Sequence, residues 1–202
     1  MKPPAAPNFR IVSGFPETAR DEVARLFWEA FSGKIGLLMR PDAHALAFLR
    51  ATLRPEFAFS ALSETGEVLG VIGIKTERGG LVSGGFRDVA NAYGVFSALW
   101  RAPLLDMLER PLAPGQLLLD GIFVSAQARG LGVGTALIHR ILEEAAAREC
   151  SEVRLDVIDT NPRARALYTR LGFEPAGVEH LGPLRLIFGF RTSTRMIYRL
   201  SD

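Results

Sequence analysis

The chain contains 202 residues, of which 48% are hydrophobic and 23% are charged, and its formal net charge is +2 at pH 7. A single hydrophobic core usually serves about 100–200 residues, so we expect one domain over residues 1–202. The composition excludes an intrinsically disordered chain, which would be poor in apolar residues and highly charged. The small net charge and the lack of a lysine-rich run give no indication of a nucleic-acid partner.

The cysteine and histidine content points away from disulfide and metal chemistry. Cys150 is the only cysteine, and the histidines His44, His139 and His180 lack a metal-binding spacing, so no metal is expected. The N-terminal residues have no apolar run of the signal-peptide kind, and nowhere do about 18 apolar residues follow one another. These features predict a cytoplasmic protein without a transmembrane segment.

The first 75 residues show two helical patterns and three strand patterns. The first helix begins at Pro16-Glu17, and the second begins at Pro41-Asp42 and ends before Pro55. A turn at Glu64-Thr65-Gly66 joins two of the strands into a hairpin. The predicted strands are Phe9–Val12, Phe57–Leu62 and Val68–Lys75.

Residues 76–115 follow a different pattern. Gly79-Gly80 and Gly84-Gly85 interrupt the chain before an apolar stretch at Tyr93–Trp100, which stops at Pro103 and resumes in Leu104–Leu108. We interpret this segment as an insertion that contains helix.

From residue 116 onward, strands and helices alternate again. A helix with Ile138, Ile141, Leu142 and Ala145 on one face separates two strands, and a short helix runs from Asn161-Pro162 to Gly172. Residues 173–200 contain two more strands, around Pro183 and Gly189. The two strands beside the first helix are Leu117–Val124 and Glu152–Val157. The order of elements predicts an α/β fold of the mixed α+β kind, with helices on a mixed sheet.

The connection between the strand Leu117–Val124 and the next helix is rich in glycine. Its sequence is Arg129-Gly130-Leu131-Gly132-Val133-Gly134. Alternating glycines let several backbone N–H groups point at one anion, and the helix N-terminus adds its own donors and positive dipole end. A P-loop would need Gly-Lys-Ser/Thr, and a dinucleotide fingerprint would need a different glycine spacing at the start of the fold. The turn therefore predicts a binding site for a pyrophosphate that belongs to a ligand of another class.

A second motif begins at Asn161-Pro162 and ends at Leu171-Gly172-Phe173. Asn161 suits a helix N-cap, Pro162 the first helical position and Gly172 the residue after the helix. The residues that share one face of this helix are Ala164, Leu167, Tyr168 and Leu171, so Tyr168 also suits core packing.

The two motifs resemble the R/Q-x-x-G-x-G/A and N-x-x-A-x-x-L-Y-x-x-x-G-F elements of the GNAT superfamily of N-acetyltransferases. The resemblance covers roughly residues 9–75 and 116–200, and the segment 76–115 departs from it. It implies the GNAT acyl-CoA N-acyltransferase fold, a mostly antiparallel sheet with one splayed strand pair. It also implies acetyl-CoA as co-substrate.

The resemblance assigns the coenzyme contacts to two stretches. The pantetheine arm would lie along Ile122, Phe123 and Val124, and the phosphates would be held by Arg129, Gly130, Leu131, Gly132, Val133, Gly134 and Thr135. Asn161 would cap its helix, contact the coenzyme or do both. The resemblance implies that Tyr168 is the general acid for the departing thiolate, because a phenol of pKa about 10 keeps its proton at neutral pH.

Two aspartates compete as the base that takes the proton of the amine. Asp120 shares a strand with Ile122 and Val124 and, by simple alternation, the same face. Asp156 stands where ribosomal-protein N-terminal alanine acetyltransferases, which this segment resembles, carry a glutamate. Either carboxylate could instead pair with an arginine.

The resemblance leaves the acceptor amine open, either a small molecule or a peptide or protein N-terminus. The apolar residues of 76–115 would pack on the core, cover the acceptor site, form a homodimer contact or lie on a membrane surface. Two other functions remain as alternatives: a non-catalytic acetyl-CoA-binding regulator, and an acyltransferase that uses another acyl-CoA.

Overall fold

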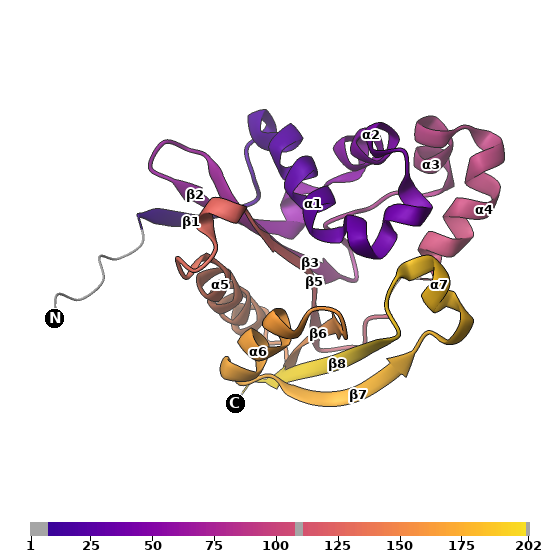
Figure 1. The fold of residues 1–202 in the computed structure, drawn as a ribbon. Helices are drawn as coiled ribbons and strands as arrows, with labels where there is room; N and C mark the ends of the chain where they lie inside the picture. Colours follow the sequence, from indigo (N-terminus) through magenta and orange to yellow (C-terminus); the bar gives the residue numbers. More distant parts are fainter. Residues whose placement is uncertain (1–7, 108–110, 201–202) are drawn as a thin grey trace, which may run out of the picture.

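A computed structural model describes residues 8–107 and 111–200 and places eight strands in one sheet (Figure 1). The strand order is β1-β2-β3-β5-β6-β8-β7, with β4 paired to β3. All neighbouring strands are antiparallel except β5 and β6, which confirms the predicted mixed, mostly antiparallel sheet. The strands are β1 (Phe9–Ser13), β2 (Ala58–Ser63), β3 (Val68–Thr76), β4 (Gly79–Gly80), β5 (Gln116–Val124), β6 (Glu152–Ile158), β7 (Glu174–His180) and β8 (Thr192–Arg199).

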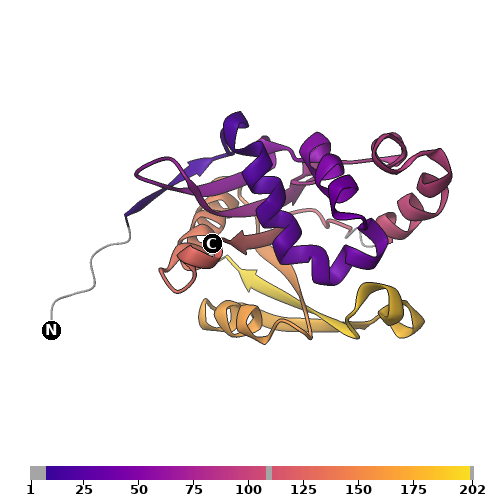
Figure 2. The ribbon, with the colours of Figure 1, turned by 45° about the horizontal axis from the view of Figure 1, so that its top comes forward.

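Helices cover both faces of this sheet (Figures 1 and 2). The pair α1 and α2 lies on one face, and α5 lies on the other. Short 3-10 helices stand at 17–19, 55–57, 126–128 and 182–184. The α-helices are α1 (Arg20–Met39), α2 (Asp42–Thr52), α3 (Phe86–Tyr93), α4 (Val95–Asp106), α5 (Val133–Ala147), α6 (Pro162–Arg170) and α7 (Arg185–Phe188).

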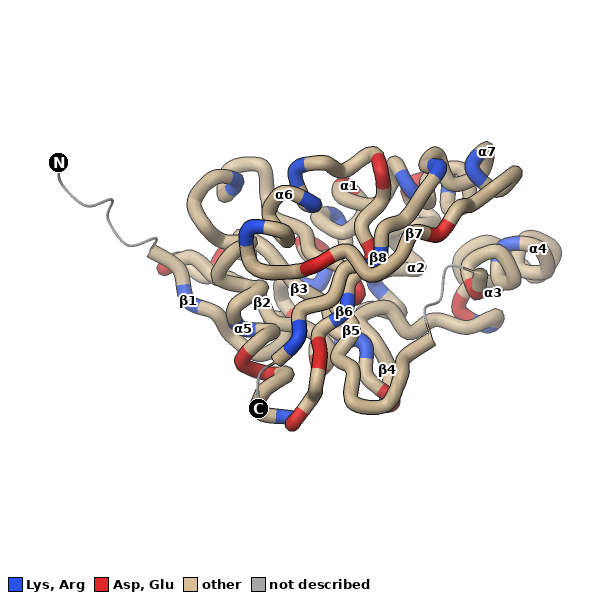
Figure 3. The backbone as a smooth tube through the Cα atoms, turned by 90° about the horizontal axis from the view of Figure 1, so that it is seen from below, with Lys and Arg blue, Asp and Glu red and all other residues tan. Residues whose placement is uncertain are grey.

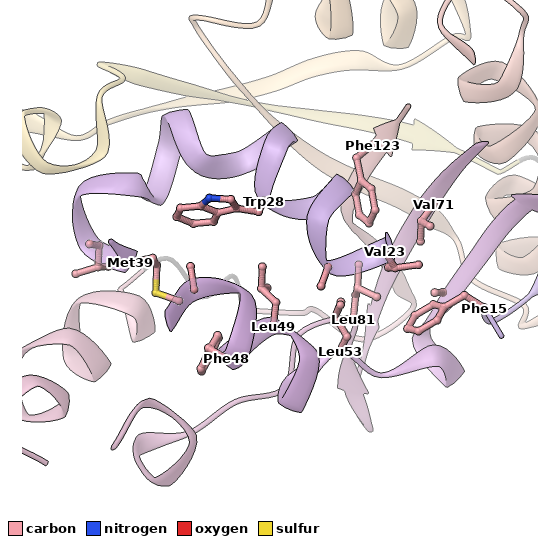
Figure 4. Close-up of a cluster of buried hydrophobic side chains, with 14 of the residues drawn as sticks. Phe15, Val23, Trp28, Met39, Phe48, Leu49, Leu53, Val71, Leu81 and Phe123 are labelled. Atoms are coloured by element: carbon pink, nitrogen blue, oxygen red, sulfur yellow. The ribbon is translucent and has the colours of Figure 1, made fainter. Parts of the chain in front are cut away.

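The sheet separates two hydrophobic cores. On β3, Val71 is buried against α1 and α2, while its neighbour Ile72 is buried against α5, because successive side chains of a strand point to opposite faces. Figure 4 shows the first core, in which Trp28 of α1, Leu49 of α2 and Phe123 of β5 point into one space. Each hydrophobic core therefore holds a layer of helices against one face of the sheet.

The two parallel strands diverge. Gln116–Leu118 of β5 pairs with Glu152–Arg154 of β6, and the ladder ends there although both strands continue. On its other edge β6 pairs with β8 over its whole length, and the β6-β8-β7 half lies apart from the half beneath α1 (Figures 1 and 2). This is the splayed strand pair that the resemblance implies.

The segment 76–115 packs on α1 and α2 through two helices. Gly94, with φ 82°, separates α3 from α4, so the apolar stretch Tyr93–Trp100 spans the junction of two helices. The predicted interruption at Pro103 is wrong, since α4 runs through it. Pro103 and Leu99 are both exposed, so the carbonyl that loses its helical hydrogen bond to the proline faces water. Leu108 lies outside the described residues.

Polar contacts fix these two helices to the C-terminal end of α1. The Arg101 guanidinium donates to the Leu38 carbonyl and, at 3.3 Å, to the Arg40 carbonyl, and it stacks on Tyr93. The Tyr93 hydroxyl donates to the Met39 carbonyl. These bonds satisfy carbonyls that the end of a helix leaves without helical partners.

Candidate active site

The glycine turn forms an anion cradle at the start of α5. Gly130 and Gly132 have φ of 80° and 82°, the left-handed region that favours glycine. The first hydrogen bond of the helix runs from the Ala136 N–H to the Gly132 carbonyl, at 3.0 Å. The N–H groups of Val133, Gly134 and Thr135 precede it, so they are available to an anion, as at other helix N-termini. The geometry fits a pyrophosphate.

The floor of this cradle continues toward β5 and α6. A Cβ on Gly134 would lie 3.6 Å from Leu167 of α6 and 3.9 Å from Ile122 and Val124, so this position of α5 faces both α6 and β5. Phe123 points to the other face, where its ring packs edge-on against Phe27 at 5.6 Å. Of the three expected pantetheine contacts, Phe123 can therefore offer only its main chain to this side.

The second motif forms α6 as its residues predict. Asn161 Oδ1 accepts a hydrogen bond from the Ala164 N–H at 3.2 Å, so its capping role is present. Tyr168 is only 6% exposed, and its ring lies 6.0 Å from that of Phe173. Burial raises the pKa of Tyr168 to about 12, so the phenol holds its proton at neutral pH.

Asp120 stands at a β-bulge. Gly73 of β3 pairs with Gly121 and Ile74 pairs with Leu119, so Asp120 is the extra residue on β5. Leu119 and Ile122 both pack toward α5, whereas Asp120 is exposed and lines a cavity on the α1 side. The expectation that Asp120 shares a face with Ile122 and Val124 is therefore wrong, because the bulge shifts the alternation.

Asp156 lies in a different environment. Its side chain is 11% exposed, and Asp156 Oδ2 accepts from the Arg154 guanidinium at 3.1 Å. Arg154 also donates to the Pro111 carbonyl at 3.2 Å. The arginine pair weighed from the sequence is thus present for Asp156. Red and blue segments are interspersed over β6, β7 and β8 in Figure 3.

A cavity of about 590 Å³ opens beside Asp120. Its walls come from α1, α2, the stretch 75–85, the end of α4 and β5. Sequence reasoning missed most of this lining, including Lys34, Lys75 and Gly80. In the sequence, only the glycine pairs at 79–80 and 84–85 marked this part of the lining, and they indicated no more than a break in the chain.

The cradle and the cavity lie on opposite faces of β5. Ile122 and Val124 face the cradle side, and Asp120 faces the cavity. β5 and β6 part after Leu118 and Arg154, between the two sites. A donor bound in the cradle and an acceptor bound in the cavity can therefore meet at the edge of β5.

Cys150 offers no alternative nucleophile. Burial raises the pKa of its thiol, and the nearby Arg148 opposes that shift only partly. A thiol with a raised pKa carries little thiolate at neutral pH.

Residues 20–173 match the model of the Acetyltransferase (GNAT) family. The chain belongs to this family. The match begins at the first residue of α1 and ends at Phe173, so it includes the cradle, Asp120, Asn161 and Tyr168. The expected family and fold are confirmed.

Curated GNAT relatives match over a shorter stretch. Thialysine N-epsilon-acetyltransferase of Bos taurus is 43% identical over 54 residues, which are 27% of this chain and 32% of that enzyme. The enzyme of the same name from Mus musculus is 44% identical over 54 residues, with the same shares. The chain thus matches about a third of the length of these relatives.

Solved GNAT structures match over nearly the whole chain. A GCN5-related N-acetyltransferase from Kribbella flavida has a TM-score of 0.64 at 18% identity and covers 96% of this chain and 98% of its own. An N-acetyltransferase from Staphylococcus aureus Mu50 has 0.65 at 16%, covering 94% and 100%. The ribosomal-protein-S18-alanine N-acetyltransferase from Escherichia coli has 0.54 at 15%, covering 96% and 95%. These likenesses show a common fold.

Residues 8–107 and 111–200 contain neither a membrane-spanning helix nor a cluster of metal ligands. No helix in these ranges is both long and apolar enough to cross a membrane. The same residues contain no group of three or more His, Cys, Asp or Glu side chains arranged to hold a metal ion.

Proposed function

We propose that this chain transfers an acetyl group from acetyl-CoA to a primary amine, in a complex that holds both substrates at once. The observation that carries the proposal is the pair of sites on opposite faces of β5, which meet where β5 leaves β6. Residues 1–202 act as one N-acetyltransferase domain, and 76–115 is a helical insertion that helps to build the acceptor side.

The donor side is formed by the residues that the family motifs mark. The main-chain N–H groups of Val133, Gly134 and Thr135 hold the pyrophosphate together with the glycine turn before them, in which the N–H groups of Arg129 and Leu131 already donate to the carbonyls of Ala126 and Ala128. The main chain of Ile122–Val124 pairs with pantetheine at the edge of β5. Asn161 keeps its capping bond and lies at the start of α6 beside this groove. Acetyl-CoA supplies the activated thioester.

Asp120 is the better candidate for the base. It lines the acceptor cavity and is exposed, whereas Asp156 is buried against Arg154. As the amine nitrogen forms its bond to the thioester carbon and the carbon–sulfur bond breaks, Asp120 takes the amine proton directly or through water. General-base catalysis of this kind contributes about 10²–10⁴ in rate.

Tyr168 acts on the leaving sulfur. Because its pKa is raised to about 12, the hydroxyl is protonated at neutral pH and can donate a hydrogen bond to the developing thiolate. Full proton transfer to a thiolate of pKa about 8.5 would be uphill, so the bond stabilises the charge before solvent or the amine proton neutralises it.

The names of the relatives support amine acetylation and leave the acceptor open. One acts, by its name, on the Nε of thialysine, and another on an alanine of ribosomal protein S18. The first acceptor is a small molecule and the second is a residue of a protein.

The test follows free thiol while the protein is mixed with acetyl-CoA and a panel of primary amines. Thiol release that depends on an amine, with a new amide seen by mass spectrometry, supports the proposal. Asp120→Asn should lower kcat/KM by about 100-fold and leave acetyl-CoA affinity unchanged. Tight acetyl-CoA binding with no turnover on any amine would instead indicate a non-catalytic regulator. Faster turnover with succinyl-CoA than with acetyl-CoA would identify succinyl-CoA as the donor.

A further inference from the structure

The cavity beside Asp120 has an apolar side on α1 and α2 and a more polar side on the stretch 75–85, which contributes Lys75, Glu77 and Ser83. On one side, α1 presents aromatic and aliphatic side chains, and α2 adds another phenyl ring. On the other side, the segment 76–115 contributes Val82 and, from the end of α4, Leu105. The apolar side chains that α1 and α2 present are Phe27, Phe31, Ile35, Met39, Phe48 and Leu49. The apolar side favours a hydrophobic body, because the N–H and C=O groups of a peptide packed against it would lack polar partners.

An aromatic ring that lines the same cavity as Asp120 lies against the next residue of β5. A Cβ on Gly121 would lie 2.9 Å from Phe31 Cζ, so the ring rests on the strand itself at the residue after Asp120. Phe27 packs against Phe31 with ring centroids 4.6 Å apart. An ammonium group beside Asp120 would therefore also meet aromatic rings, which attract cations.

The outer wall is fixed in place. Arg101 ties α4 to the Leu38 and Arg40 carbonyls, and Tyr93 ties α3 to the Met39 carbonyl. Leu105 follows Arg101 by one helical turn and lines the cavity from this anchored helix. The volume of about 590 Å³ is in the range of pockets that enclose small ligands, about 300–1,000 Å³.

The charges of the cavity favour an incoming ammonium. Carboxylates line it at Glu77, Asp106 and Asp120, against the two lysines Lys34 and Lys75. Lys34 Nζ lies 5.6 Å above the centre of the Phe190 ring. The balance of the lining is therefore negative by one charge.

We infer that the acceptor is a small primary amine on a hydrophobic alkyl or aryl-alkyl body. Its amino group lies at Asp120, and its body lies between α1 and the end of α4. This inference rests on the proposed function, since it names the substrate of the same site.

The first experiment compares amines by length. Ethylamine, butylamine, hexylamine and 2-phenylethylamine are tested with acetyl-CoA beside an unblocked alanine-first hexapeptide. We expect kcat/KM to rise about threefold to fourfold for each added methylene, as each leaves water for the cavity. A peptide that exceeds hexylamine, or a rate independent of chain length, would overturn the inference.

Matched variants on α4 locate the effect. Leu105→Ala removes part of the cavity wall, whereas Leu99→Ala makes the same change on the outer face, where Leu99 is 61% exposed. The first should raise KM for hexylamine several-fold and leave ethylamine almost unchanged, and the second should change neither. Equal effects of the two variants would contradict the placement.

A steric probe tests the amino end. Gly80→Ala would put a methyl group 3.2 Å from Asp120 Oδ2, and Gly33→Ala adds a methyl group in open space on α1. The Gly80 variant should raise KM for every amine and preserve acetyl-CoA affinity, while the Gly33 variant should behave like the parent. A loss of acetyl-CoA affinity in the Gly80 variant would count against an acceptor site there.

Equilibrium binding separates this inference from the proposed function. Hexylamine is titrated into the protein with coenzyme A present, and heat and NMR shifts of α1 and α4 residues are recorded. Binding that Leu105→Ala weakens supports the cavity as an amine site even if no acetyl transfer occurs. Turnover of other amines with no hexylamine binding would retain the proposed function and overturn the inference.

Discussion

Arg154 and Asp156 form an ion pair along one face of β6, with guanidinium and carboxylate 3.1 Å apart and side chains 5% and 11% exposed. Asp120, on the neighbouring strand, is exposed at a bulge. The two aspartates that the sequence offers as equals thus differ in what their removal would do. One loss leaves a buried guanidinium without its partner, and the other changes a cavity wall.

Asp156→Asn should therefore act mainly on stability. Breaking a buried pair by neutralising one member costs about 3 kcal/mol, because the remaining charge is poorly solvated. Urea unfolding should show this loss for Asp156→Asn and less than about 0.5 kcal/mol for the exposed Asp120→Asn. In the kinetics, Asp120→Asn should lower kcat/KM more than Asp156→Asn does. If Asp156→Asn retained its stability and lost its activity, Asp156 would be the base.

Tyr168→Phe should change the alkaline limit of stability. The folded pKa is raised to about 12 by burial, while the unfolded value is about 10, so the stability held below pH 10 is lost as pH rises toward 12. The difference of two pKa units corresponds to a loss of about 2.7 kcal/mol in the free energy of unfolding between pH 10 and pH 12. The phenylalanine variant should lack this part of the decline when unfolding is measured at pH 9 to 12. Tyr93, whose pKa is also raised to about 12, retains its own share in the variant.

The same variant tests the catalytic role at neutral pH. Loss of the hydrogen bond to the leaving sulfur should lower kcat more than it weakens acetyl-CoA binding. An equal loss in both would assign Tyr168 to packing against Phe173 alone.

Gly132→Ala should weaken the donor site specifically. Gly132 has φ 82°, where an alanine costs about 1 kcal/mol, and a Cβ there would meet nothing within 4 Å. Gly66→Ala is a matched control, because Gly66 has φ 87° in the β2–β3 hairpin and equally open space. Both variants should lose similar stability, but calorimetry should show acetyl-CoA affinity reduced, by about tenfold, only for Gly132→Ala. If Gly132→Ala and Gly66→Ala bound acetyl-CoA with equal affinity, the cradle would not be the site that holds the phosphates.

Local chemistry made part of this site predictable. Gly132 and Asn161 act through their own backbone angle and side-chain cap, so their roles follow from a few neighbouring residues. Asp120 is different, because its orientation depends on the register of β5 against β3, a long-range pairing that alternation along one strand does not reveal. The cavity walls depend in the same way on how α4 docks on α1.

The boundaries of helices and strands also divide into those that the local sequence predicts and those that it does not. The strands and the long helices agree with their patterns, whereas α7, at Arg185–Phe188, is too short for a periodic signal. A break was expected at Pro103, where α4 continues, whereas the break at Gly94 was not predicted. Its positive φ changes the chain direction, while a proline on the exposed side of α4 loses one hydrogen bond that water can replace.

Arg101→Lys should loosen the outer wall of the acceptor cavity. Arginine stacks on Tyr93 and Trp100, with its central carbon 4.5 Å and 4.3 Å from the ring centres, while it donates to two carbonyls. Lysine keeps the charge but has no planar fork, so it cannot make these contacts together. Amide hydrogen exchange in α3 and α4 should become about tenfold faster, since local opening there becomes easier.

Kinetics then decide whether the anchored wall serves the acceptor. Arg101→Lys should raise KM for amines several-fold at unchanged acetyl-CoA affinity, because Leu105 loses its fixed position while the cradle lies on the other face of β5. Arg87→Lys makes the same substitution at an exposed position of α3 and should match the parent in exchange and in kinetics. Faster exchange of α4 with unaltered amine kinetics would show that the wall can move without consequence for the acceptor, and that the specificity lies on α1.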